Sequence, residues 1–267
     1  MDSEQLKKLQ SVLLMMIKDI DLFCKENGIE YFLGGGTLLG AVRHGGFIPW
    51  DDDVDLMMTR DNYDKFVKVA PKLDKKYFVQ EWSLDKNWNY AYTKIRLNGT
   101  RFSTEFSEQF KNLHQGIFID IFVEDKTAKS RLLQKLQIFK IRLWHSVIRY
   151  RWRRLDSSDK KINAPILTKI AALFCSMKKA KRNLDKSMRR YNKKETGLLI
   201  DSSGMHLKSG GFPKSWLEGS VNKQFEDTVL PVPVEYDAYL KSLYGDYMKP
   251  NKFDSHDSGA EVDFGEY

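Results

Sequence analysis

Four aspartates fall within five positions and lead directly into the apolar segment 56–58. If residues 51–58 form a strand, side chains two positions apart point the same way, so Asp51, Asp53 and Asp55 line one face. Carboxylates at intervals of roughly 6–7 Å repel one another unless a cation lies among them. Mg²⁺ prefers oxygen ligands and typically takes a few carboxylates together with substrate phosphates and water. A solvated loop would also tolerate several aspartates, but the apolar continuation favours a core strand and a metal site.

Glycines 34–36 stand upstream of the aspartates, before a short helix expected to begin at Thr37 and end at Arg43. Glycine permits close approach of the backbone, and a helix N-terminus presents unpaired N–H groups to an anion. Gly35, Gly36 and Thr37 are therefore candidates to hold a phosphate beside the metal. A glycine triplet alone is a weak signal, but a glycine-rich helix start followed by an acidic strand is more specific. The layout suits metal-assisted phosphoryl transfer, in which positioning and charge neutralisation supply most of the catalysis.

A further carboxylate, Asp120, stands inside the apolar segment 116–123, which is a strand candidate. A buried carboxylate needs a partner or a metal, so Asp120 is a candidate metal ligand. The alternative is a salt bridge to a buried Arg or Lys. The other apolar patterns predict elements of both kinds, with helices over 3–26 and 62–73 and strands over 29–33, 78–80 and 90–97.

Positive charge is concentrated between Lys126 and Lys194, where 22 lysines and arginines stand against only three aspartates. The rest of the chain is acidic, with 22 basic and 33 acidic side chains. Charge runs are usually solvated helix surfaces, but pairing within the helices cannot neutralise so one-sided an excess. A polyanionic partner is therefore expected, with anionic lipid, nucleic acid and an anionic glycopolymer as the candidates.

The basic segment is mainly helical in pattern. From 130 to 150 one predicted helix face collects Leu132, Leu133, Leu136, Phe139, Leu143, Val147 and Tyr150. After a break at 156–165, a second helix carries a short apolar stripe of Ile166, Ile170, Leu173 and Phe174. These stripes could pack into the core or lie on an anionic membrane, and the two are compatible.

Two classes of protein are excluded by simple counts. The longest stretch without a charged side chain runs from Tyr31 to Val42, whereas a spanning helix needs about 20 apolar residues. Two cysteines, Cys24 and Cys175, supply neither a disulfide framework nor a cysteine-rich zinc site. With no secretory signal pattern at the N-terminus, a cytoplasmic protein is expected.

The residues from Leu33 to Leu56 carry a resemblance to a known family. Gly35-Gly36-Thr37 followed by Asp53-Val54-Asp55 resembles the nucleotidyltransferase fold of DNA polymerase β and its relatives. Over twenty positions of this stretch are similar to the signature of the LicD family, which includes bacterial phosphocholine transferases and, more distantly, fukutin and fukutin-related protein. Weaker resemblance continues through residues 92–96, 116–122 and 244–247.

The resemblance implies an α+β, polymerase β-like mixed sheet with flanking helices, to which the basic helices would be an insertion. We expect a catalytic core over 1–125, the insertion over 126–195, and a C-terminal part over 196–267 that packs back on the core. The implied reaction moves a phospho-substituted group from a CDP-linked donor to a sugar hydroxyl. The fukutin-related branch also carries a cysteine-bound zinc, which Cys24 and Cys175 cannot reproduce.

Carried over to this sequence, the catalytic residues are Asp53, Asp55 and Asp120. The same three and Asp51 would hold Mg²⁺, with Mn²⁺ as a substitute, and Asp120 is the candidate to accept the hydroxyl proton. The expected substrate-binding residues are Gly35, Gly36, Thr37, Arg43, His44, Trp50, Lys94 and Arg96. The three basic residues among them could instead be ordinary surface charges. His44 could simply make hydrogen bonds within its loop, and Trp50 could belong to the core.

Phosphocholine is the expected transferred group, with glycerol phosphate, ribitol phosphate or a transferred nucleotide as alternatives. A choline group needs an aromatic surface, for which Trp82, Trp88, Tyr90 and Tyr92 are candidates, although strand packing explains them more simply. The expected acceptor is a lipid-linked or polymeric surface glycan, reached by peripheral binding of residues 126–194 to the anionic inner face of the cell membrane. Nucleic acid ranks lower because no nucleic-acid-binding module accompanies the charge. A non-catalytic membrane adaptor is the remaining alternative.

Overall fold

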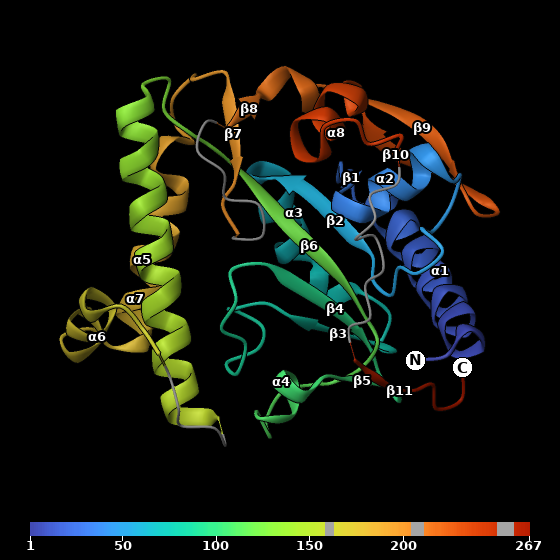
Figure 1. The fold of residues 1–267 in the computed structure, drawn as a ribbon, viewed down its shortest axis with the longest axis horizontal. Coiled ribbons are helices and arrows are strands. Elements are labelled where there is room, and N and C mark those ends of the chain that lie inside the picture. The colour runs from blue at the N-terminus through green and yellow to red at the C-terminus, as the bar shows by residue number, and fades with distance from the viewer. Residues whose placement is uncertain (158–162, 204–210, 250–258) are drawn as a thin grey trace.

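The computed structural model describes residues 1–157, 163–203, 211–249 and 259–267. A seven-stranded mixed sheet forms its centre, and helices flank the sheet (Figure 1). The expected α+β architecture with a mixed sheet is therefore confirmed. None of the described helices combines the length and apolar character that crossing a membrane requires.

Strand β6 organises the central sheet, in which the strand order is β1-β2-β6-β4-β3 with β7 and β8 beyond the second half of β6. One edge of β6 pairs in parallel with β2, and the other pairs antiparallel first with β4 and then with β7. The strands of this sheet are β1 (Phe32–Leu33), β2 (Asp55–Thr59), β3 (Tyr77–Gln80), β4 (Thr93–Leu97), β6 (Phe118–Lys126), β7 (Leu198–Asp201) and β8 (Phe212–Pro213). The two ends of β6 thus have different neighbours.

The register of these pairings brings three charged residues of the sequence analysis together. Asp55 on β2 lies opposite Asp120 on β6, and Asp120 lies opposite Lys94 on β4. All three side chains are therefore neighbours across three adjacent strands, although they are distant in sequence.

The strand that we expected to begin at Asp51 begins at Asp55. The backbone N–H of Asp51 donates to the carbonyl of Ile48 at 2.9 Å, which closes a turn, and residues 51–54 that follow do not have strand conformation. The three aspartates therefore do not form a ladder on one strand face. They approach one another through the loop that enters β2.

The predicted N-terminal helix is confirmed as α1 (Ser3–Glu26). It begins with a capping box in which the Asp2 side chain accepts from the N–H of Gln5 and the Gln5 side chain accepts from the N–H of Asp2. Its apolar side is buried in the main core, through Leu9, Leu13, Met16, Ile17 and Ile20. The next helices are α2 (Gly35–Arg43), α3 (Arg60–Val69) with the 3₁₀ turn η1 (Ala70–Lys72), and α4 (Glu105–Glu108).

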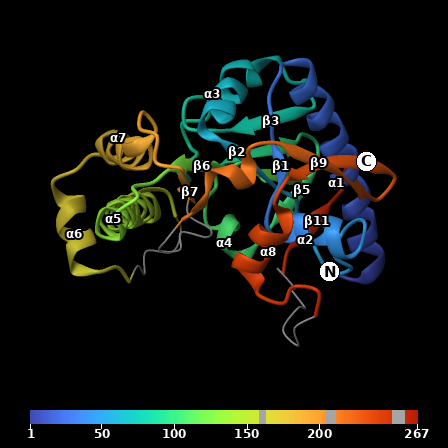
Figure 2. The ribbon, with the colours of Figure 1, turned by 90° about the horizontal axis from the view of Figure 1, so that it is seen from above.

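The basic segment forms three helices on one side of the sheet, with α6 outermost (Figure 2). They are α5 (Arg131–Asp156), α6 (Ile166–Leu173) and α7 (Met177–Met188), followed by the turn η2 (Arg189–Tyr191). α5 and α7 share a second apolar core built around Ile138, Ile141, Val147, Ile148 and Leu184. The apolar face predicted for α5 is only partly buried, because Leu132, Leu133, Leu136 and Phe139 are exposed.

The C-terminal elements return to the main core, beside α2. The hairpin of β9 (Ser220–Phe225) and β10 (Thr228–Pro233) and the helix α8 (Tyr236–Tyr244) bury Phe225, Leu230, Val232, Tyr239 and Leu240 there. The turn η3 (Lys214–Leu217) precedes the hairpin. β11 (Glu261–Asp263) pairs with β5 (Arg101–Ser103) beside the sheet.

Candidate functional site

The start of α2 is fastened to the start of β2 by two backbone-directed hydrogen bonds. The N–H of Gly34 donates to the carbonyl of Asp55 at 2.8 Å, and the N–H of Asp55 donates to Thr37 Oγ1 at 2.9 Å. Thr37 is buried, so its hydroxyl sets the position of the Asp55 backbone rather than facing a ligand from an open surface. The N-terminus of α2 consequently lies beside the acidic loop.

Two glycines make room for carboxylates at this junction. Gly35 has a φ of +46°, and a Cβ there would lie 2.8 Å from Asp55 Oδ2. A Cβ on Gly36 would lie 3.2 Å from Asp51 Oδ2. A side chain at Gly35 would meet both backbone strain and a steric clash, so the glycines allow the helix start and the carboxylates to approach each other.

The aspartates form a cluster in which burial and like charges oppose ionisation. Burial, followed by the charges of Asp53 and Asp52, raises the pKa of Asp51 to about 8. Burial, Asp53, Asp120 and Asp51 raise the pKa of Asp55 well above its usual range. Among the described residues, buried Asp51 Oδ2 and Asp55 Oδ1 find no hydrogen-bond donor. Two buried acceptor atoms in a crowd of negative charge are what a divalent cation would satisfy.

Asp120, by contrast, already has a cationic partner. Lys94 Nζ donates to Asp120 Oδ1 at 2.7 Å and to Oδ2 at 2.8 Å, and it lies 3.2 Å from the ring centroid of Phe118. Burial raises the pKa of Asp120 and lowers that of Lys94 to about 8. The structure thus shows the salt bridge that was the alternative to a metal at Asp120.

Because Asp120 is paired with Lys94, the structure does not present all four predicted aspartates as ligands of one metal ion. Within residues 1–157, 163–203, 211–249 and 259–267, no three His, Cys, Asp or Glu side chains are grouped as a preformed metal site. The residues that fit a cation best are Asp51 and Asp55, with Asp53 beside them. Asp120 could join such a site through the lone pairs that its bonds to Lys94 leave available.

Arg43, at the end of α2, connects the loop that follows to a distant part of the chain. Arg43 donates from Nε to His44 Nε2 at 2.9 Å and from Nη1 to the carbonyl of Tyr247 at 3.1 Å. Burial and the neighbouring Arg43 lower the pKa of His44, so its imidazole is neutral near pH 7. Trp50 is half-buried and packs against the main core. Arg43 and His44 thus contact each other at the end of α2, and their role in substrate binding stays a prediction.

Arg96 is buried, and its known contacts are with protein groups. It donates from Nε to Gln80 Oε1 and from Nη1 to the carbonyl of Gly116 at 2.7 Å. These bonds link β4 to β3 and to the segment before β6. Arg96 therefore holds the sheet together beside the site, whereas Lys94 reaches the acidic cluster itself.

Two residues of the site escaped the sequence analysis. Glu226, in the β9–β10 turn with a φ of +54°, accepts from the N–H of Phe47 at 2.9 Å and donates its own N–H to the carbonyl of Gly45 at 2.8 Å. Burial and then Asp55, Asp51 and Asp53 raise the pKa of Tyr244 to about 12, which places its phenol near the cluster. Tyr244 lies in one of the weaker matching segments, but no pattern in the sequence linked Glu226 to a loop so far upstream.

The aromatic residues considered for choline are packed against one another. Trp88 is only 1% exposed, donates from Nε1 to the carbonyl of Tyr92 at 2.7 Å, and has its ring 5.1 Å from that of Tyr90. Trp82 instead lies against the second core, where Lys181 Nζ is 5.6 Å from its ring. Of the four, Tyr90 also lines a cavity.

Comparison of the sequence with known proteins places this chain in a family. The sequence profile described as LicD/FKTN/FKRP, nucleotidyltransferase domain, matches residues 28–149. The chain is 32% identical to the lipopolysaccharide cholinephosphotransferase LicD of Haemophilus influenzae over 252 residues, which is 91% of each chain. A stretch of 29 residues is 69% identical to the human ribitol 5-phosphate transferase FKRP, covering 11% of this chain and 6% of that one. On the match that spans nearly its whole length, the chain belongs to the LicD family.

Proposed function

We propose that this protein is a phosphotransferase with a nucleotidyltransferase-type fold, which moves phosphocholine from CDP-choline to a sugar hydroxyl of a cell-surface glycan. The observation that carries this proposal is the 32% identity with a lipopolysaccharide cholinephosphotransferase over 91% of both chains. The unsatisfied carboxylate oxygens of Asp51 and Asp55 support it. They could bind a divalent cation, and transfer from a diphosphate donor needs such a cation to neutralise the phosphates.

In the proposed reaction, the acceptor hydroxyl oxygen bonds to the choline-bearing phosphorus, and the bond from that phosphorus to the bridging oxygen breaks to release CMP. Asp51, Asp53 and Asp55 would hold Mg²⁺ or Mn²⁺, which neutralises the diphosphate when bound. Asp120 receives the hydroxyl proton, and Lys94 beside it stabilises the ionised carboxylate beforehand. Arg43 and Lys94 offset negative charge on the leaving phosphate.

Each remaining group orients a substrate in this proposal. Gly35 and Gly36 allow the N-terminus of α2 to lie beside the diphosphate, with Thr37 fixing the adjoining strand. Neutral His44 offers a hydrogen bond to donor or acceptor, and Trp50 forms a wall of the site. Arg96 acts through the position of β4.

A direct test measures CMP release from CDP-choline, CDP-glycerol and CDP-ribitol with Mg²⁺ and a membrane-derived glycolipid acceptor. The native chain should release CMP selectively from CDP-choline, and Asp53→Asn should abolish this release. Asp61→Asn, the same change at an exposed position of α3, is the matched control and should leave it intact. Selective release from CDP-ribitol would show that ribitol phosphate is the transferred group. Pyrophosphate release from CTP with a transferred nucleotide would show that the reaction is nucleotidyl transfer.

We also propose that α5 and α6 bind the anionic inner face of the cell membrane, where the glycan acceptor is lipid-linked. Outward apolar side chains support this: Leu132 is 75% exposed, Ile166 78% and Phe174 80%. They lie within the segment that carries the excess of lysine and arginine, each of which contributes roughly 1 kcal/mol near an anionic surface. α6 is also the outermost element of the molecule on this side (Figure 2).

Vesicle sedimentation tests the membrane surface. The native chain should bind vesicles that contain phosphatidylglycerol and leave pure phosphatidylcholine vesicles unbound. Leu173→Ser should weaken binding, while Val229→Ser, at an exposed position of the β9–β10 hairpin, should not. Equal binding by both variants would contradict the assignment. In a non-catalytic adaptor, Asp53→Asn would leave the cellular function intact.

A further inference from the structure

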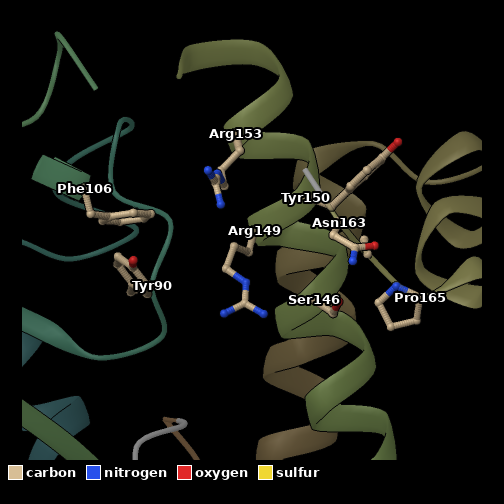
Figure 3. A pocket seen from close by; sticks show the side chains of 9 residues that line it. Tyr90, Phe106, Ser146, Arg149, Tyr150, Arg153, Asn163 and Pro165 are labelled. Carbon is tan, nitrogen blue, oxygen red and sulfur yellow. The ribbon is translucent and has the colours of Figure 1, made fainter. Parts of the chain in front are cut away.

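A cavity of about 350 Å³ lies between the C-terminal half of α5, the loop that precedes β4, the short helix α4 and the segment just before α6. It is lined by Tyr90, Phe106, Ser146, Arg149, Tyr150, Arg153, Asn163, Ala164 and Pro165. Figure 3 shows Arg149 and Arg153 extending from α5 towards Phe106 and Tyr90 on the opposite wall. One wall is therefore cationic and the other aromatic.

The two arginines are placed to act on one anion. They are four residues apart on α5 and so lie on the same side of the helix. Arg153 Cζ lies 5.8 Å from the ring centroid of Phe106, and both arginines oppose the rise that burial causes in the pKa of Tyr90. No acidic side chain is among the described residues that line the cavity. Arginine presents a planar fork of donors that fits the oxygens of a phosphate.

The aromatic wall leads from the cavity towards Asp120. The ring centroids of Tyr90 and Tyr92 are 5.1 Å apart, and Lys94 Nζ, which binds Asp120, lies 5.5 Å from the Tyr92 ring. A ligand in the cavity would thus lie near β4, the strand next to β6, which carries the proposed proton acceptor. The α2 N-terminus and Asp51, where the donor diphosphate is placed, lie beyond Lys94 and Asp120 from this cavity.

We propose that this cavity binds a phosphate-bearing sugar unit of the acceptor glycan, an assignment that rests on the proposed function. Arg149 and Arg153 bind the phosphate, and the rings of Phe106 and Tyr90 pack against the apolar face of the sugar. Ser146 and Asn163 supply neutral hydrogen-bonding groups at the same cavity. The volume lies at the small end of the range of about 300–1,000 Å³ for ligand sites, which suits a single sugar unit.

Calorimetric titration of the full chain with glucose 6-phosphate tests the site without any catalysis. Arg149 is exposed, so Arg149→Gln should fold normally. This variant should lower the affinity for glucose 6-phosphate by about tenfold, the loss expected for a charge-assisted hydrogen bond. Arg131→Gln, the same change at the start of α5 and away from the cavity, is the control and should bind as the native chain does. Equal affinity in all three proteins would overturn the proposal.

Two further titrations separate the sugar from the phosphate. Phe106→Ala should weaken binding of glucose 6-phosphate while leaving that of inorganic phosphate unchanged, because only the sugar packs on the ring. Inorganic phosphate that binds as tightly as glucose 6-phosphate would reduce the cavity to a simple anion site and overturn the sugar assignment. Vesicles containing phosphatidylglycerol should not displace glucose 6-phosphate, and displacement would assign the cavity to a lipid headgroup instead.

Kinetics then separate this inference from the proposed function. In the CMP-release assay, Arg149→Gln should raise KM for the glycolipid acceptor and leave KM for CDP-choline unchanged. A raised KM for CDP-choline alone would place the donor in the cavity and overturn the proposal. If no donor yields CMP but glucose 6-phosphate binding still depends on Arg149, the phosphotransferase proposal fails while the sugar-phosphate site stands.

Discussion

The two ends of β6 use buried carboxylates in opposite ways. At the C-terminal end, Asp125 accepts from Arg60 Nε at 2.9 Å and Nη2 at 2.6 Å, and also from Asn192 and Ser202. Burial alone would raise its pKa, but Arg60, Asn192 and Ser202 outweigh burial and lower it. The Asp125 carboxylate is saturated by these protein groups, which ties α3 and η2 to the sheet, whereas the neighbouring Glu124 is buried with no partner for Oε2 among the described residues.

At the N-terminal end, around Asp120, negative charge exceeds what the protein neutralises. Lys94 is the cation that binds Asp120, while Asp51, Asp53 and Asp55 crowd the same region, and burial together with the neighbouring carboxylates raises the pKa values of Asp51 and Asp55. Asp125, which protein groups saturate, and Asp120, which lies beside the crowded aspartates, are five positions apart on one strand. Perturbed groups of the second kind are typical of functional sites, because the missing charge is supplied by a ligand.

The comparison predicts the largest effect for Asp55→Asn. CMP release should fall by about ten-thousandfold, which corresponds to roughly 5.5 kcal/mol of transition-state stabilisation. The free energy of unfolding should stay the same or rise, because the variant removes one of several crowded negative charges. Steady-state kinetics and urea denaturation on the same preparation measure both. A large loss of stability would show that Asp55 is a structural residue like Asp125.

Asp125→Asn should give the reverse pattern. Loss of the carboxylate leaves Arg60, which is 6% exposed, with only the longer contact of 3.8 Å to Asp64, and the free energy of unfolding should fall by about 3–5 kcal/mol. CMP release by the protein that remains folded should be near native. Asp64→Asn is the control. It removes a partner of Arg189 whose side chain is more exposed than that of Asp125, and it should lower the free energy of unfolding by less than about 1 kcal/mol.

Local patterns predicted the fold wherever the signal was regular. The spacing of apolar residues gave α1 its correct bounds, and the apolar runs located β2, β4 and β6. The start of β2 was placed four residues too early, at Asp51, because alternation alone cannot reveal the turn that Ile48 closes with Asp51. The apolar stripe of α5 left open whether it packs into the core or lies on a membrane. Leu132 and Phe139 are exposed, because which part of the stripe is buried depends on where α7 packs.

The site was predictable as a set of residues but less so as a set of contacts. Spacing brought Asp51, Asp53 and Asp55 together, and strand register adds Asp120. Whether Lys94 and Arg96 face the site depends on cross-strand partners that lie far away in sequence. Lys94 meets Asp120, whereas Arg96 meets Gly116. Glu226 is beyond prediction for the same reason.

Thr37→Val tests how the two halves of the site are joined. The change removes the acceptor for the buried N–H of Asp55 while keeping the shape of the side chain. The free energy of unfolding should fall by about 1–3 kcal/mol, the cost of an unsatisfied buried donor. CMP release should also fall, by roughly tenfold, whereas Thr37→Ser should restore both. Unchanged activity in Thr37→Val would show that this bond does not position Asp55.

The smallest predicted effect is the stabilisation by Mg²⁺ and its dependence on pH. Because the folded-state pKa of Asp51 rises from 3.8 to about 8, the folded chain holds a proton that the unfolded chain has lost between these values. The contribution of Asp51 to the free energy of unfolding therefore falls as pH rises from about 4 to about 8, and is constant above. Mg²⁺ competes with this proton. At ten times the Kd that holds near pH 9, Mg²⁺ should add about 1.4 kcal/mol to the free energy of unfolding at that pH, and the same concentration should add less near pH 6. Thermal unfolding measures both. Asp51→Asn should reduce the pH dependence of the Mg²⁺ effect and leave the part that Asp55 contributes. A native chain equally stabilised at both values would place the cation away from Asp51.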